Sequence, residues 1–310
     1  MNAAEIPSMS ASDISLFERL RAQLDCTLHM LPDKPEETPD STLRCLWHLA
    51  SGSTLSSDAA MESPLLPLTA DQALSLSKLV EQRISGVPLA HLSGRQRFMG
   101  LELLTSPEAL IPRRETELLA GAAIDVLHNR ILSRQSEALV IDSCTGCGNV
   151  AVAIAHAIPA ARVFASDLSA EATDLAQRNV AYLRLGDRVE IMCGDLLQPF
   201  DEPRFHRSVD MITCNPPYIS TKKMETMPGE IVEFEPKLAF DGGALGIRIL
   251  QRLIRDASGL LREGGWLLFE VGLGQGAAVM QRMSNTGNYT EINGLSDRHG
   301  DVRTVIARSC

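Results

Sequence analysis

The sequence predicts an α/β protein: a mostly parallel seven-stranded sheet with helices on both faces and an antiparallel edge, preceded by a small helical domain. From residue 138 onward, short apolar runs alternate with stretches of helical periodicity, which is the pattern of a parallel sheet. The last two apolar runs have no helix between them, which indicates an antiparallel pair. Residues 1–85 show helical periodicity without strand patterns, and a length of 310 residues favours two domains.

The helical domain is expected to cover residues 1–85 and to provide a docking surface for the substrate. Thr69 with Gln72 three positions later predicts the start of a helix, and apolar side chains at helical spacing follow over residues 76–84. Residues 31–40 are rich in Pro, Asp and Glu, and residues 51–67 are rich in Ser and Pro. Both segments are therefore expected to be loops.

Residues 86–109 are expected to form a β-hairpin that links the two domains, with strands at 97–99 and 101–104. The second domain then covers residues 110–310. It opens on an apolar turn and on a helix whose first turn is acidic, as the positive end of a helix favours.

Within this domain the strands are expected to alternate with helices at 150–158, 170–185 and 245–261. The last two strands are expected to be joined through Asn293, Gly294 and a polar loop. The seven predicted strands cover residues 138–142, 162–167, 188–193, 209–214, 266–271, 289–292 and 302–307.

The charge balance restricts the class of partner. The net charge is −10 and the isoelectric point is about 5.2. Contacts to phosphates need a basic face, so a sequence-independent nucleic-acid binder is disfavoured, whereas a basic protein partner is not. Aromatic residues make up only 4% of the chain, so we expect a mostly aliphatic core.

Cysteine usage predicts a cytoplasmic protein. Seven cysteines are scattered along the chain, mostly in apolar runs, as in proteins of reducing compartments. No signal peptide is evident, and no stretch approaches the roughly 18 apolar residues of a membrane span. Cys144 and Cys147 have redox or zinc spacing, but no second Cys pair completes a metal site. We therefore expect no metal, and two small side chains packed in a loop.

A nucleoside site is predicted where the first strand ends. Residues 142–149 read Asp-Ser-Cys-Thr-Gly-Cys-Gly-Asn, and Gly146 and Gly148 let a ligand approach the following helix closely. Asp167 ends the second strand, where an acid can hold both hydroxyls of a ribose. The alternative for Asp167 is a helix cap, a role that Ser169 can also fill.

The tetrapeptide Asn-Pro-Pro-Tyr at 215–218 follows the fourth strand. Two prolines lack N–H groups and cannot extend a sheet, so their carbonyls are left beside an amide and an aromatic face. Such a cradle suits a planar group that donates hydrogen bonds, such as an amide or a base amine. The alternative is that the tetrapeptide is only a turn that ends the strand. An S-adenosylmethionine site uses this cradle, with residues 193–196 bordering the adenine, whereas a nicotinamide dinucleotide site does not.

Six motifs stand along the chain, at 86–94 with Arg97 and Phe98, 111–117, 142–148, 215–218, 235–243 and 301–303. In this order they resemble those of the protein N5-glutamine methyltransferases that modify peptide-chain release factors. The resemblance implies a class I, Rossmann-like methyltransferase fold, S-adenosylmethionine as cofactor, and a glutamine in a Gly-Gly-Gln loop as target. We further expect a monomer that binds neither nucleic acid nor membrane directly.

The same resemblance implies the site residues. Asn215 and Pro216 would accept the two N–H groups of the substrate amide through the side-chain oxygen and the backbone carbonyl, while Tyr218 stacks on the amide plane and Pro217 stiffens the turn. No strong base is needed, because the proton leaves after methyl transfer. The implied cofactor residues are Cys144, Thr145, Gly146, Cys147, Gly148, Asp167, Leu196 and Asn215, and the implied substrate residues are Asn215, Pro216, Pro217 and Tyr218.

Two positions depart from the family pattern. Cys144 stands where the family usually has Gly, and Arg114 where it usually has Pro. Cys144 is expected to narrow the cofactor pocket or to require a backbone angle that suits a side chain. The departures leave open a ribosomal-protein glutamine or a small-molecule amide as substrate. More distant alternatives are an adenine-N6 methyltransferase, a nicotinamide-dependent oxidoreductase and a binding module without catalysis.

Three further features have open roles. Arg113 could serve the cofactor carboxylate or pair with Glu115 or Glu117. Glu235 and the turn at 241–243 are expected to be structural. The polar segment 220–233 is a candidate lid over the substrate.

Overall fold

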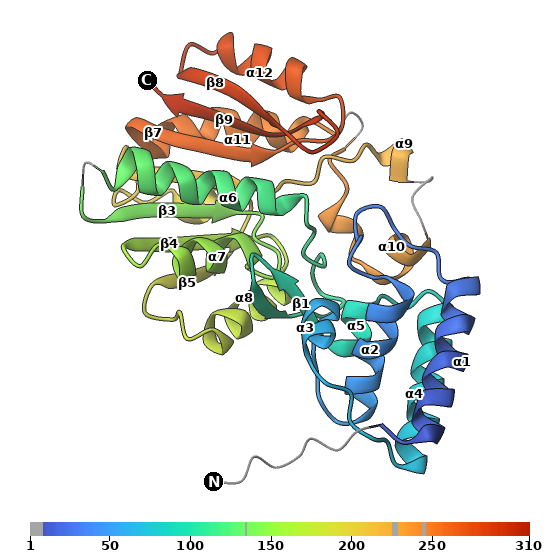
Figure 1. The fold of residues 1–310 in the computed structure, drawn as a ribbon. Helices are drawn as coiled ribbons and strands as arrows, with labels where there is room; N and C mark the ends of the chain where they lie inside the picture. Colours follow the sequence, from blue (N-terminus) through green and yellow to red (C-terminus); the bar gives the residue numbers. More distant parts are fainter. Residues whose placement is uncertain (1–8, 134, 225–228, 244–245) are drawn as a thin grey trace. The chain divides into compact units, whose positions relative to one another are not determined.

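A computed structural model of the chain describes residues 9–133, 135–224, 229–243 and 246–310 (Figure 1). The chain divides into two compact units, one of residues Met1–Pro107 with Gly229–Phe234, the other of Glu108–Pro228 with Glu235–Cys310. The hairpin that we expected to be a linker belongs to the first unit, as does the later segment Gly229–Phe234.

The first unit is helical, with a small antiparallel hairpin. The predicted capping box of Thr69 and Gln72 is present at the start of its fourth helix. The expectation of a continuous loop over 51–67 is wrong, because the Ser56 hydroxyl accepts a hydrogen bond from the Ala59 amide and starts a short helix there. The elements are α1 (Ala11–Thr27), α2 (Pro39–Ala50), α3 (Ser57–Glu62), α4 (Ala70–Ile84), α5 (Leu89–Ser93), β1 (Arg95–Phe98), β2 (Leu101–Leu104) and α10 (Gly229–Phe234).

A buried ion-pair network joins α10 to the other elements of this unit. The Arg83 guanidinium donates to Glu37 Oε2 and to Glu230 Oε2, each at 2.9 Å, and Lys34 Nζ lies 2.9 Å from Glu230 Oε1. The side chains of Arg83 and Glu37 are each 3% exposed. Burial raises the pKa of Glu37, against the opposing effect of Lys34 and Arg83. These charges are therefore costly to separate.

The second unit contains the predicted seven-stranded sheet, in the order β5-β4-β3-β6-β7-β9-β8. All neighbours are parallel except β7–β9 and β8–β9, which are antiparallel. The antiparallel edge is thus confirmed. The strands are β3 (Ala138–Ser143), β4 (Ala161–Asp167), β5 (Val189–Cys193), β6 (Val209–Cys214), β7 (Leu261–Glu270), β8 (Tyr289–Ser296) and β9 (Val302–Ser309).

Two local predictions about the last strands are corrected. Asn293 and Gly294 lie within β8 and pair with β9, so the turn comes later, at residues 297–301. A helix that we did not predict, α12 (Gly276–Ser284), connects β7 to β8. The other α-helices among the described residues of this unit are α6 (Thr116–Val126), α7 (Asn149–Ala157), α8 (Ala170–Tyr182), α9 (Thr221–Met224) and α11 (Arg248–Leu260).

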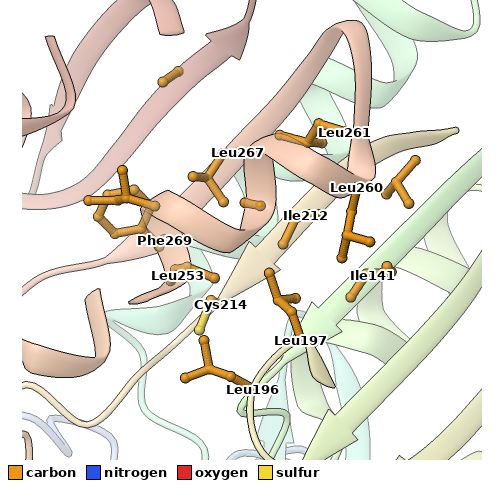
Figure 2. Close-up of a cluster of buried hydrophobic side chains, with 14 of the residues drawn as sticks. Ile141, Leu196, Leu197, Ile212, Cys214, Leu253, Leu260, Leu261, Leu267 and Phe269 are labelled. Carbon is orange, nitrogen blue, oxygen red and sulfur yellow. The ribbon is translucent and has the colours of Figure 1, made fainter. Parts of the chain in front are cut away.

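One apolar core covers the face of the sheet that packs against α11 and α12 (Figure 2). The register places apolar residues in rows across the strands, because alternate residues of each strand share a face. Cys214 is paired with Phe269, and Phe269 with Val305. The longer row runs through Phe164, Ile141, Ile212, Leu267 and Ala307. On the other face, α7 contacts both α6 and α8, and all three helices contact strands of the sheet.

Chain topology places a ligand site at the ends of β3 and β6. From β3 the chain proceeds to β4 on one side, whereas β6, β7, β9 and β8 lie on the other. In open α/β sheets, ligands bind outside the carboxyl ends of the strands at such a reversal. The glycine loop, Asp167 and the Asn-Pro-Pro-Tyr segment all follow carboxyl ends at this edge.

Among the described residues, the structure contains no helix that is both long and apolar enough to span a membrane. The seven cysteines are free; Cys45, Cys147 and Cys214 are buried, while Cys26, Cys193 and Cys310 are exposed.

Candidate active site

A cavity of about 570 Å³ lies at the carboxyl edge of the parallel strands, within the range typical of small-molecule sites. Pro216 and Tyr218 are the chain neighbours of Pro217, which lines the cavity, and Pro216 is buried. The predicted site residues that line the cavity are Cys144, Thr145, Gly146, Cys147, Asp167, Leu196, Asn215 and Pro217.

The glycine loop connects β3 to α7 and closes one side of the cavity. Gly146 has φ of +55°, and a Cβ there would meet no atom within 4 Å, so the loop is open toward the cavity at this point. Gly148 has φ of +84°, and a Cβ there would lie 3.2 Å from the Ala176 Cβ. Gly146 thus gives a ligand access to the backbone, and Gly148 lets α7 pack closely on α8.

Cys144 occupies a backbone conformation that favours glycine. Its φ is +55°, in the left-handed region, where a side chain costs roughly 1–2 kcal/mol. Our expectation of an angle that suits a side chain is therefore not met. The side chain packs against the core cluster that contains Cys214, whose own pKa is raised by burial first and then by Cys144.

Asp142, which we did not single out, fixes the start of the loop. Its carboxylate is 1% exposed and accepts hydrogen bonds from Thr145 Oγ1 at 2.6 Å and Thr213 Oγ1 at 2.7 Å. It thus joins the loop to β6. Burial raises its pKa from 3.8 to about 6. The sequence signal was its place within the Asp-x-x-Thr-Gly motif.

Asp142→Asn should change how stability depends on pH. Because the folded pKa lies above the unfolded one, the stability from this group is present below pH 4 and is lost as pH rises through about 6. Two pKa units correspond to at most about 3 kcal/mol. We therefore expect wild-type unfolding free energy to fall relative to that of the variant between pH 4 and 7, measured by urea denaturation. Parallel pH profiles for the two proteins would contradict this.

Asp167 sits at the end of β4 with an ordered carboxylate. Oδ2 accepts the Gly146 amide at 2.8 Å and Oδ1 accepts the Ser169 amide at 3.0 Å. Ser169, not Asp167, is the N-cap of α8, since its hydroxyl accepts from the Ala172 amide. The alternative role of Asp167 as the cap of this helix is therefore wrong. Each carboxylate oxygen retains a lone pair for a further donor.

Asn215 and Tyr218 are held by two residues that we did not predict. Asn215 Nδ2 donates to Thr116 Oγ1 at 3.1 Å, and the Tyr218 hydroxyl donates to Glu270 Oε1 at 2.7 Å. Thr116 stands at the start of α6, inside the motif at 111–117, and Glu270 ends β7. Only the fold brings these segments together, although an acid that ends a buried strand is a usable signal.

Arg113 donates to Glu235 Oε1 at 2.5 Å, and the Ile111 amide donates to Glu235 Oε2 at 3.0 Å. Glu235 therefore holds the segment that leads into α6, which agrees with the structural role that we expected. Arg113 also lines the cavity. Of the expected lid at 220–233, residues 225–228 lie outside the described residues. Residues 221–224 form α9, and residues 229–233 lie in α10.

Comparisons with known proteins assign the chain to a family. The model of the methyltransferase small domain matches residues 121–247. A release factor glutamine methyltransferase of Moorella thermoacetica is 36% identical over 80% of this chain and 83% of its own length. That of Geobacter sulfurreducens is 34% identical over 93% and 96%, respectively. The chain belongs to the release factor glutamine methyltransferase family.

The solved structures agree on the fold. The catalytic domain of human hMettl16 superposes with a TM-score of 0.52 at 16% identity, covering 74% of this chain and 81% of that domain. The class I methyltransferase fold is thus confirmed, and the oxidoreductase alternative is not favoured.

This family member is an S-adenosylmethionine-dependent methyltransferase, and its cavity fits that cofactor. The open backbone at Gly146 suits a ligand that lies against the loop, and the Asp167 carboxylate suits the two hydroxyls of a ribose. Asn215 also lines the cavity.

Proposed function

We propose that this methyltransferase modifies the side-chain amide nitrogen of a protein glutamine, namely that of the Gly-Gly-Gln loop of a peptide-chain release factor. The observation that carries the proposal is the position of Asn215, which lines the same cavity as the glycine loop and Asp167. The names of the relatives from Moorella and Geobacter support the choice of target.

The chemistry follows from the weakness of the nucleophile. A carboxamide nitrogen shares its lone pair with the carbonyl, so the site must hold the NH2 group and favour the positive charge that develops on nitrogen. The Asn215 side-chain oxygen and the Pro216 carbonyl accept its two N–H groups and do both. When bound, S-adenosylmethionine would supply an electrophilic methyl and would keep the electron pair of the S–C bond that breaks. The nitrogen then loses a proton to water.

Positioning supplies most of the rate enhancement in this scheme. Holding two reactants in a reactive geometry can contribute about 7–11 kcal/mol. Pro217 lines the cavity and stiffens the turn, while the hydroxyl of Tyr218 is anchored on Glu270 beside the amide site. Tyr218 is then placed to stack on the substrate amide.

Asp167→Ala should weaken cofactor binding about 10–100-fold, because a hydrogen bond to a charged group contributes about 1.5–3 kcal/mol. The measurement is titration calorimetry with S-adenosylhomocysteine. Asp174→Ala is the matched control, since Asp174 is an exposed acid on the neighbouring helix α8 and should leave affinity unchanged. Unchanged affinity in Asp167→Ala would show that another group holds the ribose.

The target is tested by transfer of a labelled methyl group to the release factors of the host. A parallel sample contains a release factor whose loop glutamine is changed to alanine. If the release factor is labelled and the variant without the loop glutamine is not, the result supports both the chemistry and the target. Label on a ribosomal protein or a small amide instead would replace the target and keep the chemistry, and label on DNA adenine would replace both.

We further propose that the protein works in the cytoplasm, which suits its free thiols and a substrate of the translation apparatus. We also propose that it acts as a monomer and without direct contact to nucleic acid; the acidic charge balance supports the second of these.

A further inference from the structure

A buried carboxylate stands behind the proposed amide site without lining the cavity. Glu270 is 2% exposed and ends β7, the strand next to β6. It accepts two hydrogen bonds, from Thr116 Oγ1 at 2.9 Å and from the Tyr218 hydroxyl at 2.7 Å. Burial raises the pKa of Glu270, whereas the hydrogen bonds donated by Tyr218 and Thr116 act against burial and favour the ionised carboxylate. Arg303, 3.7 Å from Glu270 Oε1, acts in the same direction as these hydrogen bonds.

The count of protons decides the direction of the neighbouring hydrogen bonds. An ionised carboxylate only accepts, and a hydroxyl has a single proton to donate. Thr116 and Tyr218 each give that proton to Glu270, so each hydroxyl oxygen can only accept from its other neighbour. Tyr218 accepts from Arg303 at 3.3 Å, and Thr116 accepts from Asn215 Nδ2 at 3.1 Å.

This direction determines which end of the Asn215 amide is available to the substrate. With Nδ2 committed to Thr116, Oδ1 is left as the acceptor at the cavity. A flipped amide would place an NH2 group against the NH2 group of the substrate glutamine, so two donors would face each other.

We infer that Glu270 is a positioning residue for methyl transfer: acting through Thr116, it keeps the Asn215 amide turned so that Oδ1 meets the substrate nitrogen. The inference rests on the proposed function. It also assigns Thr116 as the link, because Thr116 Oγ1 contacts both Glu270 and Asn215.

The chain offers a matched control for the link. Thr304 pairs with Glu270 across β7 and β9 and is 0% exposed, and its hydroxyl has no hydrogen-bond partner among the described residues. Thr304→Val and Thr116→Val therefore make the same chemical change in buried sites next to Glu270. Only the second change removes an acceptor from Asn215.

The first experiment is a double-mutant cycle on kcat for the amide substrate that the wild type labels. Glu270→Gln can accept from only one hydroxyl, so the other must turn. We expect at least a tenfold fall in kcat, with KM and S-adenosylhomocysteine affinity within twofold of wild type. In the Asn215→Ala background, Glu270→Gln should cost less than a further twofold. Thr116→Val should behave like Glu270→Gln, Thr116→Ser should restore most of the rate, and Thr304→Val should match wild type.

The second experiment does not depend on activity. The side-chain amide signals of Asn215 in a ¹⁵N–¹H NMR spectrum are identified by their absence in Asn215→Ala. Glu270→Gln and Thr116→Val should shift them, and Thr304→Val should not. Unmoved signals, or losses in kcat that multiply fully in the double variant, would overturn the inference. Moved signals in a protein that labels no amide would uphold the orientation and reject the proposed function. If Glu270→Gln fails to fold, Thr116→Val carries both measurements.

Discussion

Asn215→Ala should lower kcat about 10²–10³-fold, the usual effect of removing one hydrogen-bonding group that stabilises charge in a transition state. The variant loses the oxygen that accepts a hydrogen bond from the substrate nitrogen. That oxygen also stabilises the positive charge that develops on the nitrogen during methyl transfer. The loop that holds the cofactor starts on a different strand, β3. S-adenosylhomocysteine affinity should therefore change by no more than a few-fold. Single-turnover methyl transfer and calorimetry measure the two quantities.

A suitable control for this variant is Asn129→Ala. Asn129 is an exposed residue of the same unit, in the segment Leu127–Ile131 that follows α6 and outside the cavity lining, and its substitution should leave kcat at the wild-type value. Wild-type turnover in Asn215→Ala would reject the proposed mechanism. A large loss of cofactor affinity with normal single-turnover rate would instead move Asn215 from the substrate to the cofactor.

Arg83→Met should destabilise the first unit by about 3–5 kcal/mol, the cost of leaving buried charges without their partner. The Arg83 side chain forms ion pairs with both Glu37 and Glu230. Burial already raises the pKa of Glu37. Loss of the guanidinium leaves that carboxylate with less compensation and weakens the attachment of α10, in which Glu230 lies.

Fluorescence can follow this unit in the full chain. The sequence has two tryptophans, and Trp47 lies in the first unit while Trp266 lies in the second. In a Trp266→Phe background, urea denaturation followed by tryptophan emission reports the first unit. Arg19→Met removes an exposed arginine of α1 and should stay within about 0.5 kcal/mol. Equal midpoints for Arg83→Met and Arg19→Met would show that the network contributes little.

The parallel sheet is the part of the fold that the sequence predicts best. Buried parallel strands appear as short apolar runs, and helices between them keep a 3.6-residue period, so both patterns are local. β6, predicted at residues 209–214, has those bounds. Helix α12 was missed because its small residues, among them Gly276, weaken the apolar pattern of the helix. Helix α3 was missed because its six residues are too few to show a helical period.

The same division holds for the site. Residues that follow strand ends, such as Asp167 and Asn215, can be found from sequence, because parallel strands bring their carboxyl ends to one edge. Glu270 and Thr116 could not be assigned a role in this way. They lie far apart in the chain from each other and from Asn215. The direction of a hydrogen bond also depends on which donors and acceptors lie next to it in the folded protein.

The sequence by itself determined the α/β class, the strand and glycine-loop positions and the family, because each depends on local periodicity or on short motifs. Tertiary structure alone decided that Gly229–Phe234 belongs with the helical unit, that Asp142 joins the loop to β6, and that Glu270 stands behind the amide site. The physical reason is common to all three. A buried charge is stable only with partners, and its partners here come from segments that only folding brings within hydrogen-bond distance.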